Sequence, residues 1–216
     1  MKTTKRAAAK AAQIAGDADK LLAYMDREGI DGGTGSRTPR AHMGGLIADS
    51  ALQRQQKYLA TVVPRVNGLI EAWPDANTTT GFLDRSAAGT LSSTVNWPEG
   101  ERIVQMQATA QALAVEGVET VEQMLVRFTD ESTRLPLRQA LRRVPNVGAK
   151  TTDYLEILSG SEKVAAIDVR IRRATGRAGI VRTGYFYLQD VLNHAAAQRG
   201  WTVGSLDVVL WNSHKA

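Results

Sequence analysis

Two side chains in the second half of this 216-residue chain could carry out covalent chemistry, the amine of Lys150 and the carboxylate of Asp168. A neutral lysine amine attacks electrophilic carbon and can form an imine, but it needs burial or a neighbouring charge to lose its proton. A carboxylate can accept that proton or stabilise positive charge on a substrate. The simpler alternatives are that Lys150 binds a phosphate and that Asp168 only caps a helix.

The segment that positions Lys150 is predicted to be a pair of helices joined by a tight hairpin. Apolar residues at helical spacing run to Val144, and Pro145 stops that helix because proline biases its predecessor away from the α conformation. Asn146 tolerates a left-handed turn, and Gly148 allows another backbone to approach closely. A second helix over residues 149–158 would expose unpaired N–H groups at its start, which suits a phosphate.

The segment that positions Asp168 is a short apolar run, residues 164–167, which leads into a third predicted helix. An acidic residue at the end of such a run, 18 positions after a lysine at a helix start, is an unusual pairing. Asp168 is well suited to cap the helix that follows, so capping alone remains an alternative.

These residues resemble the helix-hairpin-helix signature of the DNA glycosylase superfamily that includes endonuclease III and the 8-oxoguanine glycosylases. The family pattern is roughly Leu-Pro-Gly-Val-Gly-x-Lys-Thr-Ala, followed by an apolar run that ends in a catalytic Asp. The matching residues are Val144-Pro145-Asn146-Val147-Gly148-Ala149-Lys150-Thr151-Thr152 and then Ala165-Ala166-Ile167-Asp168-Val169-Arg170-Ile171. Asn146 replaces the usual glycine, and asparagine also adopts positive φ. The likeness is close over about 45 residues and looser over residues 86–216.

The resemblance implies an all-α fold of two helical lobes, with the active site in the cleft between them. Residues 1–45 would form an N-terminal helix and a flexible connection. One lobe would combine residues 46–90 and 183–216. The other would span residues 91–182 and contain both the hairpin, at about 134–158, and Asp168.

The resemblance also implies a mechanism. Such enzymes rotate a nucleotide out of the duplex, because a stacked base cannot be attacked. Lys150 would attack the sugar C1′ and form an imine, and Asp168 would take its proton. The Lys-to-Asp spacing fits members that are both glycosylase and lyase. Trp97 and Tyr185 are the candidates for stacking on the flipped base.

Relatives can also hold a monovalent cation, K⁺ or Na⁺, through main-chain carbonyls of the hairpin. Here the ligands would be the backbone oxygens of Arg142, Val144 and Val147. No other cofactor is expected.

Positive charge is concentrated around the hairpin. Residues 134–182 hold 11 basic and 4 acidic residues, a net charge of +7, whereas the chain as a whole carries +5. A basic face beside a phosphate-binding turn is typical of nucleic-acid binding, so double-stranded DNA is the expected partner. The expected DNA contacts are Arg142, Arg143, Asn146, Val147, Gly148, Ala149, Thr151, Arg170, Arg172 and Arg173.

Composition limits the class of protein. At 43% apolar residues the chain can bury a core, and without cysteine it has neither disulfides nor the iron–sulfur cluster that many endonuclease III relatives hold. No apolar run approaches the roughly 20 residues needed to span a bilayer, and the N-terminus lacks a signal-peptide core. We expect a soluble, cytoplasmic, nucleoid-associated monomer with no membrane partner.

Helical periodicity extends along the rest of the chain. It predicts helices over residues 3–28, 46–63 (ended near Pro64) and 185–199, and no convincing strand. Thr120 with Gln123 resembles a capping box.

Three functions remain open at this stage. The first is a glycosylase with lyase activity, the second a monofunctional glycosylase in which Asp168 activates water, and the third a non-enzymatic hairpin that binds DNA. For either glycosylase, the expected substrate is an oxidised base such as 8-oxoguanine, or alternatively a hypermodified cytosine, methylated or glucosylated, of phage DNA. The latter would make the protein a defence enzyme rather than a repair enzyme.

Overall fold

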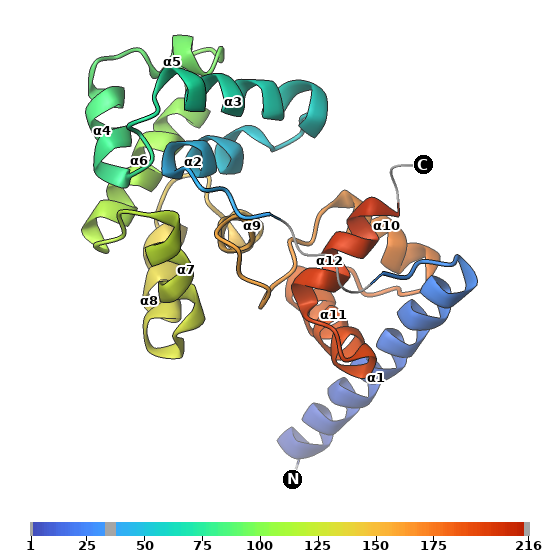
Figure 1. The fold of residues 1–216 in the computed structure, drawn as a ribbon. Coiled ribbons are helices and arrows are strands. Elements are labelled where there is room, and N and C mark those ends of the chain that lie inside the picture. The colour runs from blue at the N-terminus through green and yellow to red at the C-terminus, as the bar shows by residue number, and fades with distance from the viewer. Residues whose placement is uncertain (1, 33–37, 214–216) are drawn as a thin grey trace. The chain divides into compact units, whose positions relative to one another are not determined.

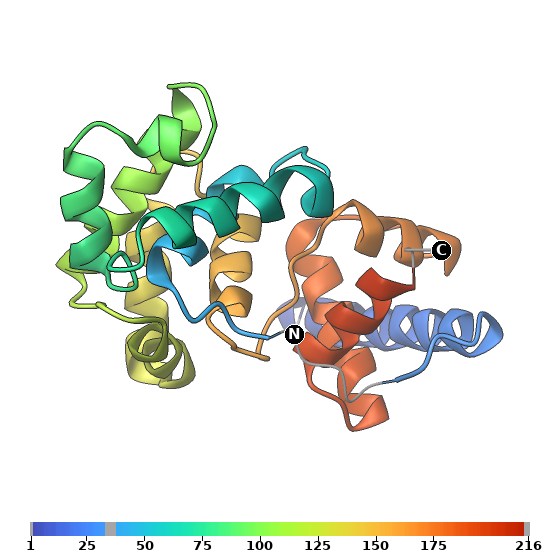
Figure 2. The same ribbon diagram turned by 45° about the horizontal axis from the view of Figure 1, so that its top comes forward.

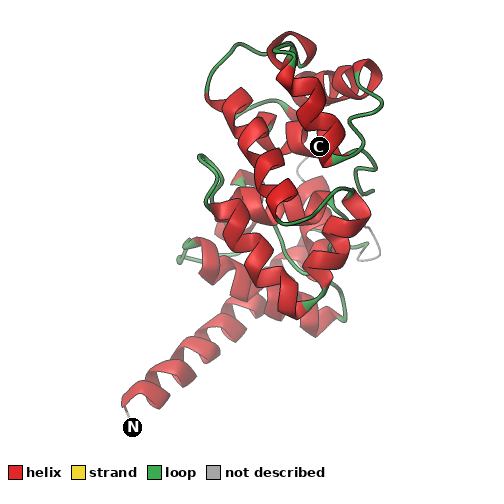
Figure 3. Ribbon diagram, turned by 90° about the vertical axis from the view of Figure 1, so that its left-hand side faces the viewer, coloured by secondary structure: helices red, strands yellow, loops and turns green. Residues whose placement is uncertain are grey.

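The structure, a computed structural model, describes residues 2–32 and 38–213, and within them every regular element is a helix (Figures 1 and 3). The predicted all-α class is therefore confirmed. The chain divides into two compact units. Unit 1 contains residues 1–37 and 162–216, and unit 2 contains residues 38–161. No helix among the described residues is long and apolar enough to cross a membrane.

Unit 1 joins the first helix of the chain to the last three. Its elements are α1 (Lys2–Arg27), α10 (Val169–Arg177), α11 (Tyr185–Arg199) and α12 (Val203–Asn212). In both views α1 lies beside α11, which also packs on α12 (Figures 1 and 2). Leu21 and Met25 of α1, Leu188 and Leu192 of α11 and Leu210 of α12 are fully buried in one core. The helices predicted over residues 3–28 and 185–199 are confirmed.

Polar contacts also fix α1 to α11. Lys10 pairs with Asp190 at 2.9 Å, and the Tyr187 hydroxyl donates to Asp17 at 2.6 Å. Although burial opposes its ionisation, hydrogen bonds from Lys20 and Tyr187 hold the pKa of Asp17 below its usual value. Burial and the Asp17 carboxylate raise the pKa of Tyr187 to about 12.

Unit 2 surrounds a helix that is buried along its whole length. All ten residues of α2 (Met43–Leu52) are buried, and α2 packs against four other helices of the unit. The other elements of unit 2 are η1 (Tyr58–Val62), α3 (Val63–Ala72), α4 (Thr79–Ala87), α5 (Leu91–Thr94), α6 (Glu101–Val115), α7 (Val121–Thr129), α8 (Glu131–Arg142) and α9 (Ala149–Leu158). The predicted capping box of Thr120 and Gln123 is present at the start of α7.

The prediction of one continuous helix over residues 46–63 is wrong, because the helix is interrupted between residues 53 and 57. The α-helix ends at Leu52, and the chain restarts at Tyr58 as a turn of π-helix that runs directly into α3. Gln55 interrupts the helix with φ 58°, a left-handed conformation that helix interiors do not use. Pro64 lies in the first turn of α3, where the missing N–H costs nothing, and therefore helps to start a helix rather than end one.

The division into units differs from the expected lobes. Residues 46–90 belong with 91–161 because α2 packs on α3, α4, α6 and α9. Residues 162–182, with Asp168, belong with the two ends of the chain because α10 packs on α12 and α1.

Candidate functional site

The hairpin in unit 2 forms the predicted pair of helices with a tight turn between them. After α8, the Val144 N–H donates to Leu141 and the Val147 N–H donates to Val144, each at 3.1 Å. Asn146 has φ 66°, the left-handed conformation expected of it. Helix α9 begins at Ala149, where the sequence places it.

The start of α9 is open. Gly148 is the N-cap and provides no side chain to satisfy the first N–H groups of the helix. A Cβ built on Gly148 would meet no atom within 4 Å, so another backbone or an anion can approach here. Helix starts of this kind carry partial positive charge.

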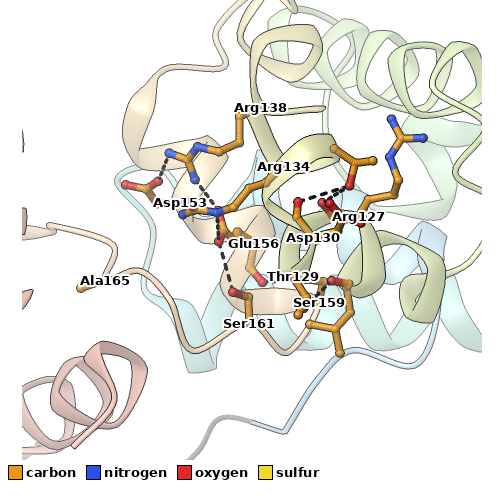
Figure 4. A network of polar contacts seen from close by, with 12 residues as sticks. Arg127, Thr129, Asp130, Arg134, Arg138, Asp153, Glu156, Ser159, Ser161 and Ala165 are labelled. Atoms are coloured by element: carbon orange, nitrogen blue, oxygen red, sulfur yellow. Dashed lines mark hydrogen bonds and ion pairs between the residues drawn. The ribbon is translucent and has the colours of Figure 1, made fainter. Parts of the chain in front are cut away.

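A buried ionic cluster holds the two hairpin helices together (Figure 4). Arg134 and Arg138 of α8 point at Glu156 of α9, which is fully buried. Arg134 Nε lies 3.0 Å from Glu156 Oε1, and Arg138 forks between Glu156 and Asp153. Burial alone would lower the pKa of Arg138, but the charges of Asp153 and Glu156 raise it. These two arginines therefore serve the fold, although they lie in the basic segment expected to bind DNA.

Lys150 lies in the first turn of α9 and is partly exposed. Its neighbour Thr151 is also partly exposed. Arg142 and Arg143, at the end of α8, are exposed and make no side-chain hydrogen bond or ion pair with any described residue. The three carbonyls expected to hold a monovalent cation belong to the same turn, where the Val144 oxygen already accepts the Val147 N–H.

Asp168 lies in unit 1, at the N-cap of α10. Its Oδ1 accepts hydrogen bonds from the N–H groups of Arg170, at 2.8 Å, and Ile171, at 3.0 Å. Asp168 is partly exposed, and its Oδ2 accepts no hydrogen bond from the residues that the structure describes. The capping alternative is thus realised, through one of the two carboxylate oxygens.

The segment that leads to Asp168, residues 164–167, is held by a side chain from α11. The Gln189 side-chain N–H donates to the Ala165 carbonyl, and the Gln189 side-chain oxygen accepts a hydrogen bond from the Ala165 N–H at 3.5 Å. Residues 164–167 are buried, as the apolar run predicts. Sequence reasoning did not identify Gln189, because an isolated glutamine on a helix gives no signal.

The arginines of α10 differ in their surroundings. Arg170 stacks on Trp211, with its guanidinium carbon 4.2 Å from the ring centroid, and Arg172 donates to the carbonyl of Thr183. Arg173 and Arg177, one turn apart, are both exposed. Neither makes a side-chain hydrogen bond or an ion pair with the residues that the structure describes.

Both aromatic candidates for base stacking are engaged within their own units. In unit 2, the guanidinium carbons of Arg102 and Arg65 lie 4.4 and 5.5 Å from the centroid of the Trp97 ring. In unit 1, Tyr185 is partly buried against the core. Both residues are nevertheless partly exposed.

A second buried cluster in unit 2 was not anticipated. Asp49 of α2 is fully buried and accepts hydrogen bonds from Arg40 at 2.7 Å and from the hydroxyls of Tyr58 and Tyr154, each at 2.9 Å. Burial and the Asp49 charge raise the pKa of Tyr58. Arg40 and Tyr58 lie nine residues from Asp49, on either side of it, and Tyr154 lies 105 residues away, so no helical spacing could have found this cluster. It ties α2 and α9, the second helix of the hairpin, to the segment before α2.

Lys150 lies in unit 2 and Asp168 lies in unit 1.

A scan against models of known protein families found no match, and a search of curated proteins found no similar sequence. Among the residues that the structure describes, no three His, Cys, Asp or Glu side chains gather as a metal site would require. The hairpin with Lys150 and the carboxylate of Asp168 are therefore the candidate functional groups.

Proposed function

We propose that this protein is a DNA glycosylase that removes a damaged or modified base and forms a covalent imine through Lys150. The observation that carries the proposal is the placement of Asp168. This carboxylate caps α10 through Oδ1 alone, at the end of a buried and clamped approach, and keeps Oδ2 for a proton or a developing charge.

The hairpin supplies the DNA anchor in this proposal. The open start of α9 offers N–H groups to a backbone phosphate, and the exposed Arg142 and Arg143 add charge beside it. Because these contacts involve the phosphate backbone, they hold the duplex in register without reading its sequence. A monovalent cation at the hairpin carbonyls is part of the same proposal.

The chemical step follows from the two side chains. The neutral amine of Lys150 attacks the sugar C1′, and the C1′–N bond to the base breaks with its electron pair leaving on the base. Asp168 takes the proton that the new ammonium loses and returns it to the departing base. The lone pair on the Lys150 nitrogen then forms the C=N bond as O4′ leaves C1′, and the remaining N–H proton is transferred to O4′, which produces an open-chain imine between Lys150 and the sugar.

The proposed substrates are 8-oxoguanine and the hypermodified cytosines of phage DNA. Both present a planar base that must leave the stack before C1′ is exposed, and base flipping selects bases that unstack easily. Excision of 8-oxoguanine would indicate a repair enzyme, and excision of a hypermodified cytosine would indicate a defence enzyme.

Borohydride trapping tests the proposal. The purified protein is mixed with duplexes containing 8-oxoguanine, oxidised pyrimidines, uracil, an abasic site or glucosylated hydroxymethylcytosine, and the imine is reduced to a stable amine. We expect a protein–DNA adduct with wild type and none with Lys150→Ala. Excision without an adduct would make the enzyme monofunctional, with Asp168 activating water. DNA binding without excision of any base on the panel would leave a non-enzymatic hairpin module.

A matched variant tests Asp168 without disturbing the fold. Asparagine caps helices as well as aspartate does, so Asp168→Asn keeps the start of α10 but loses the proton acceptor. Proton transfer of this kind contributes about 10²- to 10⁴-fold to rate, and excision should fall by that order. Unchanged excision in Asp168→Asn would overturn the assignment.

A further inference from the structure

The first half of α1 lies outside the core of unit 1. Every residue over 5–13 is exposed, and Ile14 is the first described side chain of α1 that packs on the core. In Figure 1 these turns project beyond the other helices of unit 1. We call residues 5–13 the basic arm. Five of its nine residues are alanine, the strongest helix former, and the packed half of α1 spares the arm the cost of helix nucleation. The arm is therefore helical without burying apolar surface.

The basic side chains of the arm share one side of the helix. At about 100° per residue, Lys5, Arg6 and Lys10 fall within an arc of about 140°. The opposite side carries alanine alone, and no acidic residue occurs before Asp17. The arm thus has a positive face and a small, uncharged face.

Much of this charge has no carboxylate partner. Lys5 and Arg6 make no side-chain hydrogen bond or ion pair with the residues that the structure describes. Lys10, nearer the core, pairs with Asp190 at 2.9 Å. Asp17, the other acidic residue near the arm, is buried and ion-paired within its own helix. Lys5 and Arg6 are therefore the cations that the arm offers to a ligand.

Arg182 extends the positive surface from the arm toward α10. Its Nη1 donates to Gln13 Oε1 at 2.9 Å, and Arg182 is itself exposed. The next residue, Thr183, accepts a hydrogen bond from Arg172 of α10 through its carbonyl. These contacts connect the arm, through the loop before α11, to the helix that Asp168 caps.

The composition of the arm indicates which class of ligand it fits. Helices that lie on membranes carry large apolar side chains opposite their basic face, and the cores of protein interfaces are rich in aromatic residues and methionine. The arm has no apolar side chain larger than alanine. Its only strong interaction is with negative charge, and duplex DNA carries one negative charge per about 1.7 Å of its axis.

We propose that the basic arm binds the phosphate backbone of double-stranded DNA, as an anchor additional to the hairpin. The proposal rests on the proposed function only in taking DNA as the partner. Lys5 and Arg6 each contact a phosphate and read no base, because phosphate contacts carry no direct sequence information. The arm strengthens binding to any duplex and takes no part in the reaction at the sugar.

The test is the salt dependence of binding to an undamaged duplex, measured by fluorescence anisotropy. Lys5→Gln with Arg6→Gln removes both cations and keeps a good helix former at each position, so helix content should not change, which circular dichroism checks first. Arg27→Gln with Arg85→Gln is the matched control. It removes the same charge from two exposed arginines that already pair with carboxylates.

We expect the arm variant to reduce the slope of log affinity against log salt by about 2, because each phosphate contact contributes about 0.9. The control should keep the wild-type slope. An unchanged slope in the arm variant would overturn the proposal, and so would an equal reduction in the control, which would show an effect of net charge alone. An unchanged slope together with lost binding to vesicles of phosphatidylserine and phosphatidylcholine would assign the arm to a lipid surface instead.

This measurement needs neither a damaged base nor catalysis. Absence of a borohydride adduct with wild type would refute the glycosylase and leave the arm unaffected, whereas a normal adduct with an unchanged slope would refute only the arm. Failure of wild type to bind any duplex would overturn the arm as well. With an active enzyme, the arm variant should reach the wild-type trapping rate at saturating protein but require more protein to do so, since it has lost affinity and no reacting group.

Discussion

Replacing Glu156 by glutamine should destabilise unit 2 far more than the removal of an ordinary surface charge. Glu156 is completely buried, and its two oxygens meet Arg134, Arg138 and the Ser161 hydroxyl. Removing one partner of a buried ion pair costs about 3–5 kcal/mol, because the remaining charge stays buried without compensation. Both arginines retain some contact with water, with side chains 24% and 17% exposed, which places the expected loss near the lower limit, at about 3 kcal/mol.

Urea unfolding measures this loss, with helix content and tryptophan fluorescence followed together. For an m-value of about 2 kcal/mol per molar urea, a loss of about 3 kcal/mol moves the midpoint of unit 2 down by about 1.5 M. Glu101→Gln is the matched control, because Glu101 pairs with Arg54 at 3.3 Å while its side chain is 71% exposed. Its midpoint should shift by no more than about 0.5 M, since exposed pairs contribute about 0–1 kcal/mol. Equal shifts in the two variants would show that the ionic cluster does not hold the hairpin together.

Three further predictions concern local features of unit 2. The ring of His42 caps α2 by accepting the Gly45 N–H at 3.1 Å, and burial lowers the pKa of this histidine in the folded protein. The unfolded chain therefore binds a proton more readily than the folded protein does, and the free energy of unfolding should decrease as pH falls below about 6.5. Wild type should therefore lose more stability than His42→Asn between pH 7.5 and 5 in urea titrations, and equal losses would contradict the capping role. Asn146→Ala should cost about 1 kcal/mol and Asn146→Gly almost nothing in thermal unfolding, because φ is 66° at this position and alanine resists it; a cost for glycine equal to that for alanine would argue against this cause. If the hairpin binds DNA, Arg142→Gln with Arg143→Gln should reduce the slope of log affinity against log salt by about 2, and an unchanged slope would exclude both residues from phosphate contact.

Local signals predicted much of the fold. The capping box at Thr120, the N-cap at Asp168 and the left-handed turn at Asn146 each depend on residues close in sequence, and each is present. The break between α2 and α3 could not be predicted in this way. Gln55 is not a residue type that marks a left-handed turn, and Pro64 stands equally well at the start of a helix or beyond its end.

The candidate site was predictable only in part. Lys150 and Asp168 were found because their segments match a known pattern, but spacing along the chain cannot reveal that the two residues belong to different units. The polar cluster around Asp49 and the clamp of Gln189 on Ala165 join residues far apart in sequence. Such contacts depend on tertiary packing, and composition and periodicity do not show which two distant residues will meet.

The assembly of unit 1 from both ends of the chain sets an order for its synthesis. The last residue of α1 is Arg27 and the first of its main partner, α11, is Tyr185, so about 160 residues must leave the ribosome between them. At about 5–20 residues per second this takes roughly 8 to 30 seconds. During that interval Leu21 and Met25 have no α11 to cover them, and all of unit 2 emerges before α11 does. Unit 2 can thus fold during translation, whereas α1 remains an amphipathic helix in need of protection, by a chaperone for example, until the end of the chain arrives.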